Sequence, residues 1–530
     1  MTELTISRLT ATVRPAPGAV DQSGRVDRLL HRLAGERLEA GLALWALPSG
    51  EWCLRRIDAT VALDLDEPDA RLETVWADTL LESIARQVRT PSADVVHFAD
   101  RRDAVYDLVA SVAARRIERA WAWQQVGILS ASDPSPETDP AGAVLAVLGR
   151  FPEHAVHAVV AAARRPGVVA LHRMLGTAGW DRLAGLTAAG AAGALGSAAA
   201  LGSAGALGSA GALGSAGATT VEPLRGERTA GFLAGRPPSE IKQRAARLVA
   251  GSSFAGAVSS SGLRPGLEAV RAWAVIVVAE SDPASLRWDR AGQVLDAVQG
   301  LLVPVAAAVG LVRPGSSGEQ REQGGSSGPS GPLVGSRDGD EEPAGTSSAE
   351  SPGGPEQVSR PEARTAWGGL LFLLATAEAA GVPDRVLADE RLRARTLRWT
   401  LHSLARRLVP LAADDPAALA FAGLPPSAEV PDGPVATEDE VTALEEWATR
   451  WAEVAAARLG RPADPYAGDE TAFDVVGRVA RRPAEIVADP GWIEVLLSLE
   501  AVDLDIRRAG LDIDPGWVPW LGVVVRFSYG

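Results

Sequence analysis

Residues 313–362 divide this sequence, because a stretch of this composition cannot build a core. Gly, Ser, Pro and charged residues dominate it, and Leu333 and Val334 are its only apolar pair. So little apolar surface cannot offset the entropy lost on ordering the chain. We therefore expect a disordered linker with a globular part on either side of it.

A second unusual stretch, residues 183–221, contains no charged residue. A six-residue Ala-Leu-Gly-Ser-Ala-Gly repeat places Leu195, Leu201, Leu207 and Leu213 in step. The stretch is long enough to cross a membrane, but its Leu residues do not share one helical stripe. Three interpretations stay open: a flexible low-complexity spacer, a loosely packed helical hairpin and a membrane-inserted segment. We expect this repeat to occupy residues 183–222.

The overall composition restricts the partners and the compartment. The 530 residues are 46% hydrophobic and 22% charged, which is typical of globular proteins with ample core. A formal net charge of -15 argues against a nucleic acid or an anionic membrane as the main partner. Cys53 is the only cysteine, so no internal disulfide can form. We expect no secretory signal, because the first ten residues have neither a basic region nor an apolar run. A single cysteine fits a reducing compartment, and we expect a cytoplasmic protein. Lys242 is the only Lys among many Arg, which resembles the coding bias of a GC-rich bacterial genome.

Hydrophobic periodicity predicts a β-α-β-α module in residues 1–90. Residues 4–13 and 57–65 alternate between apolar and polar side chains, as strands do. Residues 26–44 and 70–88 carry apolar side chains at three- and four-residue steps, as helices do. The acidic side of the second strand is expected to face solvent.

The rest of the chain is predicted to be mostly helical. Regions 91–182 and 223–312 are expected to be helical, with a buried helix pair that includes residues 270–278 and 294–312. Region 363–530 is expected to be a helical domain closed by a terminal β-hairpin. Its helices are predicted at residues 367–380, 385–411, 441–459 and 471–487, with a capping box at Thr437 and Glu440. The predicted fold class is α+β, predominantly α-helical, with long disordered linkers.

The terminal hairpin is marked by two copies of Asp-Pro-Gly-Trp, at residues 489–492 and 514–517. Pro presets φ, Gly allows a positive φ, and Asp can accept a backbone hydrogen bond, so each copy predicts a turn. A β-type run follows each turn. The first run changes phase near residue 500, which indicates a bulge or bend before residues 502–507.

Tryptophan is unusually frequent, with 15 Trp against 3 Tyr. Trp492, Trp517 and Trp520 lie close together in the terminal hairpin. One interpretation makes them core residues. The other makes them outward-facing anchors for a partner protein, because a desolvated Trp is a favoured interface contact.

No catalytic pattern accompanies these features, and we expect neither an enzyme nor a cofactor. Glu153, His154 and His157 could hold a metal in principle, but three ligands on one turn without a fourth form a weak signal. Asp503 and Asp505 are expected to pair with neighbouring Arg residues. We expect Cys53 to act as a small hydrophobic residue.

Three pieces of the sequence resemble the tape measure proteins of extracellular contractile injection systems, which are phage-tail-like particles. The first is the N-terminal module, with Ile6-Ser7-Arg8-Leu9, Glu36-Arg37-Leu38 and Arg56-Ile57-Asp58. The second is the run from Gly368 and Gly369 to Leu374. The third joins Asp414-Asp415-Pro416-Ala417 and Ala422-Gly423-Leu424 to the Asp-Pro-Gly-Trp terminus and Pro519-Trp520-Leu521.

This resemblance implies a non-enzymatic role in particle assembly, in which the protein sets or accompanies the length of the tube and sheath. The expected partners are inner-tube, baseplate or cap proteins. A literal ruler acts through extended length, at about 1.5 Å per helical residue. Two globular ends favour a scaffold or terminal adaptor instead. The rival hypothesis is a membrane-associated anchor or adaptor of such a particle that uses residues 183–221.

Overall fold

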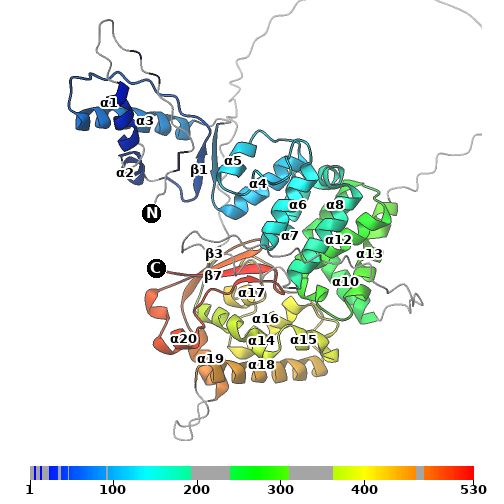
Figure 1. Cartoon of the computed structure of the whole chain (residues 1–530). Coiled ribbons are helices and arrows are strands. Elements are labelled where there is room, and N and C mark those ends of the chain that lie inside the picture. The colour runs from blue at the N-terminus through cyan, green and yellow to red at the C-terminus, as the bar shows by residue number, and fades with distance from the viewer. Residues whose placement is uncertain are drawn as a thin grey trace, which may run out of the picture.

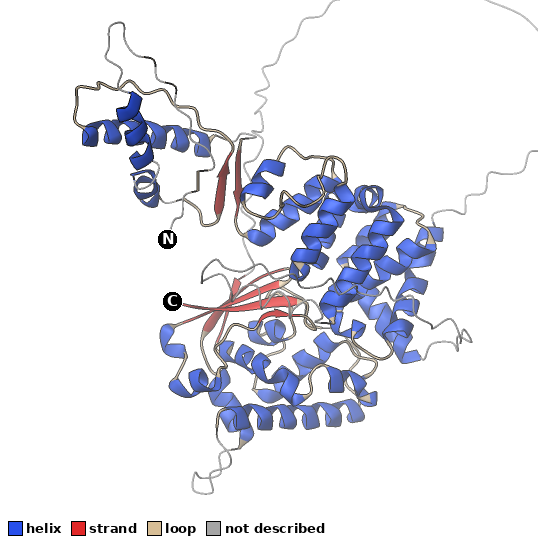
Figure 2. Ribbon diagram, viewed as in Figure 1, coloured by secondary structure: helices blue, strands red, loops and turns tan. Residues whose placement is uncertain are grey.

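The computed structural model describes residues 23–192, 239–308 and 362–530, except 34–36, 46, 91–93, 432 and 461–470, and also Thr5, Ile6, Thr12 and Arg14. Helices dominate these ranges, and the strands form one sheet of two strands and one of five (Figure 2). The predicted α+β class with mainly α-helix is confirmed. Residues 193–222 of the predicted repeat, 313–361 of the predicted linker and most of the predicted strand at 4–13 lie outside the described residues.

The described residues of the N-terminal module form three helices and a two-stranded sheet. Its elements are α1 (Ser23–Arg32), α2 (Leu38–Ala43), β1 (Glu51–Leu54), α3 (Asp69–Arg89) and β2 (Val95–Phe98). Leu29 of α1 and Leu33, which follows this helix, pack with Leu72 and Trp76 of α3 in a small separate core. β1 pairs antiparallel with β2, and the buried Cys53 of β1 belongs to the main core.

The prediction of a strand at residues 57–65 is wrong, because this segment belongs to neither of the two sheets found among the described residues. The alternating apolar side chains of this segment still contribute to packing, since Val61, Leu63 and Leu65 lie against the small core. The Arg25 guanidinium donates hydrogen bonds to the carbonyl oxygens of Leu65 and Glu67. The Arg25 side chain thus satisfies two backbone carbonyl groups at the end of this segment.

The helical middle consists of two groups of helices packed side by side (Figure 1). The first group is α4 (Arg101–Ala113), α5 (Ala120–Gln125), α6 (Pro140–Arg150), α7 (Pro152–Ala162), the kinked turn η2 (Ala163–Gly167) and α8 (Val168–Ala191). The second is α10 (Ser239–Gly251), α11 (Ser253–Ser261), α12 (Leu267–Ser281), η3 (Pro283–Leu286) and α13 (Ala291–Ala308). Asp100 and Asp139 cap α4 and α6 by accepting hydrogen bonds from Asp103 N and Gly142 N. The predicted helices at residues 270–278 and 294–312 correspond to α12 and α13, which pack together, although residues 309–312 lie outside the described residues.

The C-terminal part places helices beneath a five-stranded sheet with the order β3-β4-β5-β7-β6 (Figure 1). The strands are β3 (Glu362–Thr365), β4 (Ala484–Asp489), β5 (Trp492–Leu497), β6 (Gly516–Val518) and β7 (Val523–Tyr529). The helices are η4 (Gly368–Thr376), α14 (Ala377–Ala380), α15 (Asp384–Ala388), η5 (Glu390–Leu392), α16 (Leu397–Leu408), α17 (Pro416–Phe421), α18 (Glu438–Arg458), α19 (Ala472–Ala480), η6 (Leu499–Ala501) and α20 (Leu504–Ala509). The predicted capping box at Thr437 and Glu440 opens α18.

Two predictions for the terminus need correction. The hairpin is not a separate closing unit, because β4 and β5 form the hairpin and β7 then pairs parallel to β5. Residues 498–522 carry the chain back across the sheet, as a parallel pair requires. Residues 502–507 were predicted to be extended, but Asp503 accepts a hydrogen bond from Ile506 N and caps the helix α20.

Two long predicted helices also break. Residues 385–411 form α15, η5 and α16, because Asp389 accepts a hydrogen bond from Arg391 N and Thr396 accepts one from Trp399 N. Each side chain starts a new helix where the previous one ends. Residues 471–487 do not form one helix, because the helix α19 ends at Ala480 and the strand β4 begins at Ala484.

A single apolar core runs from Cys53 in β1 to Phe527 in β7. The helical middle and the C-terminal part therefore form one body, although the sequence separates them by residues 309–361. Leu371, Phe372 and Leu373 of η4 lie fully buried in this core. Phe372 meets Phe527 with ring centroids 4.9 Å apart.

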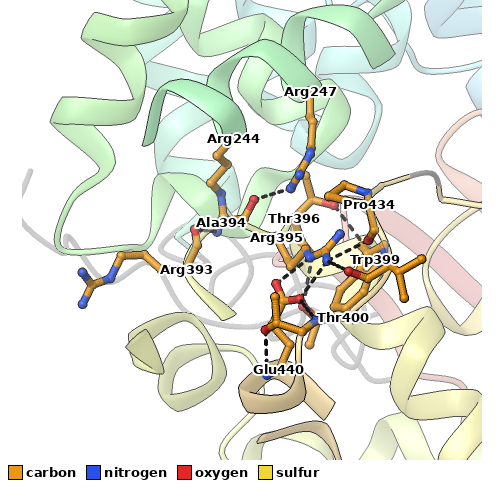
Figure 3. Close-up of polar contacts among 12 residues, drawn as sticks. Arg244, Arg247, Arg393, Ala394, Arg395, Thr396, Trp399, Thr400, Pro434 and Glu440 are labelled. Atoms are coloured by element: carbon orange, nitrogen blue, oxygen red, sulfur yellow. Dashed lines mark hydrogen bonds and ion pairs between the residues drawn. The ribbon is translucent and has the colours of Figure 1, made fainter. Parts of the chain in front are cut away.

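Hydrogen bonds from Arg244 and Arg247 of α10 to the carbonyl oxygens of Arg393 and Ala394 tie the helical middle to the C-terminal part (Figure 3). The Arg244 guanidinium lies 2.7 Å from the Asp282 carboxylate, and both side chains are only 1% exposed. Asp282 also accepts hydrogen bonds from Ser285 Oγ and from Leu397 N at the start of α16. Nearby, Arg395 contacts Glu440 at 2.7 Å and lies 4.1 Å from the Trp399 ring centroid.

We predict that D282N lowers the free energy of unfolding by about 3–5 kcal/mol, because it leaves the buried charge of Arg244 uncompensated. Chemical denaturation of the full chain measures this loss. The control is D384N, which removes the partner of Arg287 in a more exposed pair at 3.2 Å between the end of η3 and α15. Its cost should stay below about 1 kcal/mol. Equal losses in the two variants would contradict the role of burial.

Candidate functional site

The five-stranded sheet has one face turned away from its helices, and we call it the outer face. The strand registers place three transverse rows of side chains on it. These rows are Arg364, Glu485, Leu496 and Ser528; Glu362, Val487, Glu494 and Arg526; and Asp489, Trp492, Val524 and Trp517. The opposite side chains, such as Ile486, Ile493 and Phe527, are buried against the helices.

Helix α4 covers the row that contains Trp492. Arg102 of α4 lies 2.9 Å from Asp489, and its guanidinium sits 5.8 Å from the Trp492 ring centroid. Arg526 approaches the same ring at 5.7 Å. Tyr106 Oη donates a hydrogen bond of 3.3 Å to the carbonyl oxygen of Pro490. Trp492 is therefore engaged within the molecule, by cation–π contacts that fasten the sheet to the helical middle.

The predicted turn at residues 489–492 is confirmed. Asp489 and Trp492 are paired in register, and Gly491 has a φ of +78°. A Cβ at Gly491 would lie 2.2 Å from His157 Cδ2, so the turn backbone rests directly on the imidazole of α7. The turn needs glycine both for its positive φ and for this close approach.

The other two predicted anchors, Trp517 and Trp520, differ in their burial. Trp520 is 4% exposed and belongs to the main core, which agrees with the interpretation of this residue as a core residue. Trp517 is half-buried and lines a small cavity together with Pro519 and His157. Its neighbours in the cavity are helical residues of the same chain, which makes Trp517 a second contact between the sheet and the helical middle.

The first row of the outer face remains open and borders a hollow of about 450 Å³. Leu496 is 40% exposed at its centre. Arg364 and Glu485 lie on one side of Leu496, 3.5 Å apart, and Ser528 on the other donates a hydrogen bond of 2.6 Å to Glu494. An apolar centre with a charged and polar rim is the arrangement found in protein–protein interfaces.

The histidines of α7 lie beneath the covered end of the sheet and are held neutral. Burial lowers the pKa of His157 to about 4, and burial together with nearby Arg102 lowers the pKa of His154 to about 4. His157 Nε2 lies 3.1 Å from the carbonyl oxygen of Gly522, so this nitrogen carries the proton and donates. Within the described ranges, no three His, Cys, Asp or Glu side chains are placed to hold a metal ion.

Cys53 behaves as predicted for a small hydrophobic residue. Burial raises the pKa of its thiol to about 11, with a smaller contribution from the charge of Glu51. The thiol therefore stays protonated near neutral pH, and it lies 2% exposed in the core.

No protein-family model, curated protein or solved structure matches this chain. Of the helices that the structure describes, none has both the length and the apolar character to cross a membrane. The membrane hypothesis concerned residues 183–221, of which 193–221 are not among the described residues.

The predicted anchor Trp492 lies on the same strand as Leu496, but Leu496 is the more exposed of the two. Trp492 attracted the prediction through its size, whereas Leu496 of the same strand occupies the open position. Alternation along residues 492–496 was the available signal, because it places both side chains on one face. Nothing local could identify Arg102 as the residue that covers Trp492, because it lies in α4.

We predict that G491A is more destabilising than G516A. Both glycines have positive φ values, +78° and +64°, so both substitutions strain the backbone. Only at Gly491 would the new methyl group meet His157, since no atom lies within 4 Å of a Cβ at Gly516. Thermal and chemical unfolding should show an additional loss of about 1–3 kcal/mol for G491A. Equal losses would contradict the contact between the turn and α7.

We also predict that acid destabilises the fold through His154 and His157. Their pKa values are about 4 in the folded chain, below the ordinary 6.5, so the unfolded chain binds protons first. The contribution of these two neutral histidines to the free energy of unfolding is complete above about pH 6.5. It declines as the pH falls towards 4, by about 2 kcal/mol for each histidine. Unfolding free energies across this pH range measure the effect.

H157Q is the informative variant for this prediction, because its amide can still donate to the Gly522 carbonyl but does not titrate. It should make the acid slope shallower. H31Q, at an exposed position of α1, is the matched control and should leave the slope unchanged. An unaltered slope in H157Q would contradict the assignment.

Proposed function

We propose that this chain is a non-catalytic assembly component of a phage-tail-like contractile injection particle. In this proposal it folds and assembles in the cytoplasm and binds a tube, baseplate or cap protein. The open row of the outer face carries the proposal, because it combines an exposed apolar centre with a charged rim around a hollow. The resemblance of three sequence segments to tape measure proteins of such particles supplies the identity of the particle.

The segments that carry the C-terminal resemblance build the support of this sheet. Asp415 caps α17 and accepts a hydrogen bond of 2.8 Å from Thr365 of β3. Gly423 approaches Leu521 so closely that a Cβ would lie 2.8 Å from its side chain. Gly368 and Gly369 pack as tightly against Ala484 and the Val479 carbonyl oxygen. These segments are scattered in the sequence, but all of them pack against the sheet or the chain beside it, which is a structural reason for their joint occurrence.

The compact body favours an adaptor over a literal ruler. A ruler sets length by being extended, whereas α8, with 24 residues, belongs to the same core as the terminal sheet. In the adaptor that we propose, one folded body presents the open row to a particle protein.

The first test is L496D in the native host, with particles purified and their subunits quantified. A charge at the centre of the contact should reduce incorporation of the protein by about tenfold or more, because a truncated or charged interface centre costs about 2 kcal/mol. L267D is the matched control, since Leu267 is exposed at 67% on α12, away from the sheet. Normal incorporation of L496D would overturn the proposed contact.

A second arm separates the adaptor from a ruler and from a membrane anchor. Deletion of residues 195–218 should leave sheath length unchanged in electron micrographs if the chain is an adaptor. Shorter sheaths would favour a ruler. Loss of the protein from membrane fractions on this deletion would favour the anchor.

A further inference from the structure

Strand β3 forms one end of the five-stranded sheet, and only one of its sides is paired. Glu362–Thr365 pair antiparallel with β4, in the register Glu362↔Val487 to Thr365↔Ala484. On its other side, β3 makes no backbone hydrogen bond to any residue that the structure describes. An unpaired edge of this kind is a template for another strand.

The side chains of β3 alternate between the two faces of the sheet. Glu362 and Arg364 lie on the outer face, and both are exposed. The Arg364 side chain is 89% exposed and approaches Glu485 at 3.5 Å. Ala363 and Thr365 lie on the inner face, where Thr365 is buried and bonded to Asp415. The free edge thus presents one acidic and one basic side chain on the same face.

These charges are self-complementary in one register. If a two-fold axis perpendicular to the sheet relates two copies of β3, the outer faces of both copies lie on the same side. Centring on Ala363 then places Glu362 of each copy opposite Arg364 of the other. A shift by two residues in either direction places Arg364 opposite Arg364, or Glu362 opposite Glu362. Opposite charges across a strand pair stabilise it, and like charges destabilise it.

We propose that two copies of this chain associate through antiparallel pairing of their β3 strands, centred on Ala363, so that their two sheets become continuous. Arg364 would then lie between Glu485 of its own chain and Glu362 of the second copy. The charges alternate along this row across the seam. Charged edge strands commonly prevent association, but here one register turns both charges into attractive contacts. This inference is independent of the particle function that we propose.

The experiment is sedimentation of the purified full-length chain over a wide range of concentrations. The wild type should show a monomer–dimer equilibrium. R364E and E362R should each weaken self-association by about tenfold or more, because both cross-strand pairs become repulsive. R56E, at an exposed Arg in the N-terminal module, should leave the equilibrium unchanged. Thermal unfolding verifies that each variant is folded.

A mixture of R364E and E362R is the decisive arm. In the proposed register, the two glutamates of one chain face the two arginines of the other. An equimolar mixture of the variants should therefore form a heterodimer more readily than either variant alone forms a homodimer. A wild type that stays monomeric, variants that dimerise as well as the wild type, or a mixture without heterodimer would each overturn the proposal.

Discussion

The buried carboxylate of Asp282 is the contact on which the arrangement of the two main parts depends. One oxygen accepts hydrogen bonds from Arg244 of α10, from Ser285 of η3 and from Leu397 N at the start of α16. A buried carboxylate is unfavourable unless such partners are all present. The pair therefore requires α10, η3 and α16 to be in place together, which couples the helical middle to the C-terminal part.

This constraint extends to the rest of the C-terminal helices. Leu397 follows the segment whose carbonyl groups, at Arg393 and Ala394, accept hydrogen bonds from Arg244 and Arg247. Arg395, in the middle of this segment, then reaches Glu440 at the capping box of α18. The long helix α18 is thereby coupled to α10 through residues 393–395. The second fastening, the turn at Gly491 on α7, holds the sheet from its other end.

Local signals made part of this structure predictable. The Asp-Pro-Gly-Trp turn at residues 489–492, the capping box of α18 and the apolar pair α12 and α13 depend on residues close in sequence. The segment at 57–65 and residues 502–507 alternate equally well, yet neither is a strand. Alternation indicates a half-buried extended chain, and only a neighbouring strand can make it part of a sheet. Arg244 and Leu397 are far apart in sequence, so their common partner Asp282 had no local signature.

The contacts of Trp492 within the molecule explain why the candidate surface lies at Leu496, towards the other end of β5. A large aromatic side chain on an outer sheet face is available either to a partner or to the molecule itself. Arg102 from α4 and Arg526 from β7 both approach this ring, so the molecule uses it. The same docking covers one end of the outer face and leaves the other end open. Leu496, two side chains further along that face of β5, is then the apolar group left to solvent, and a partner gains most by covering it.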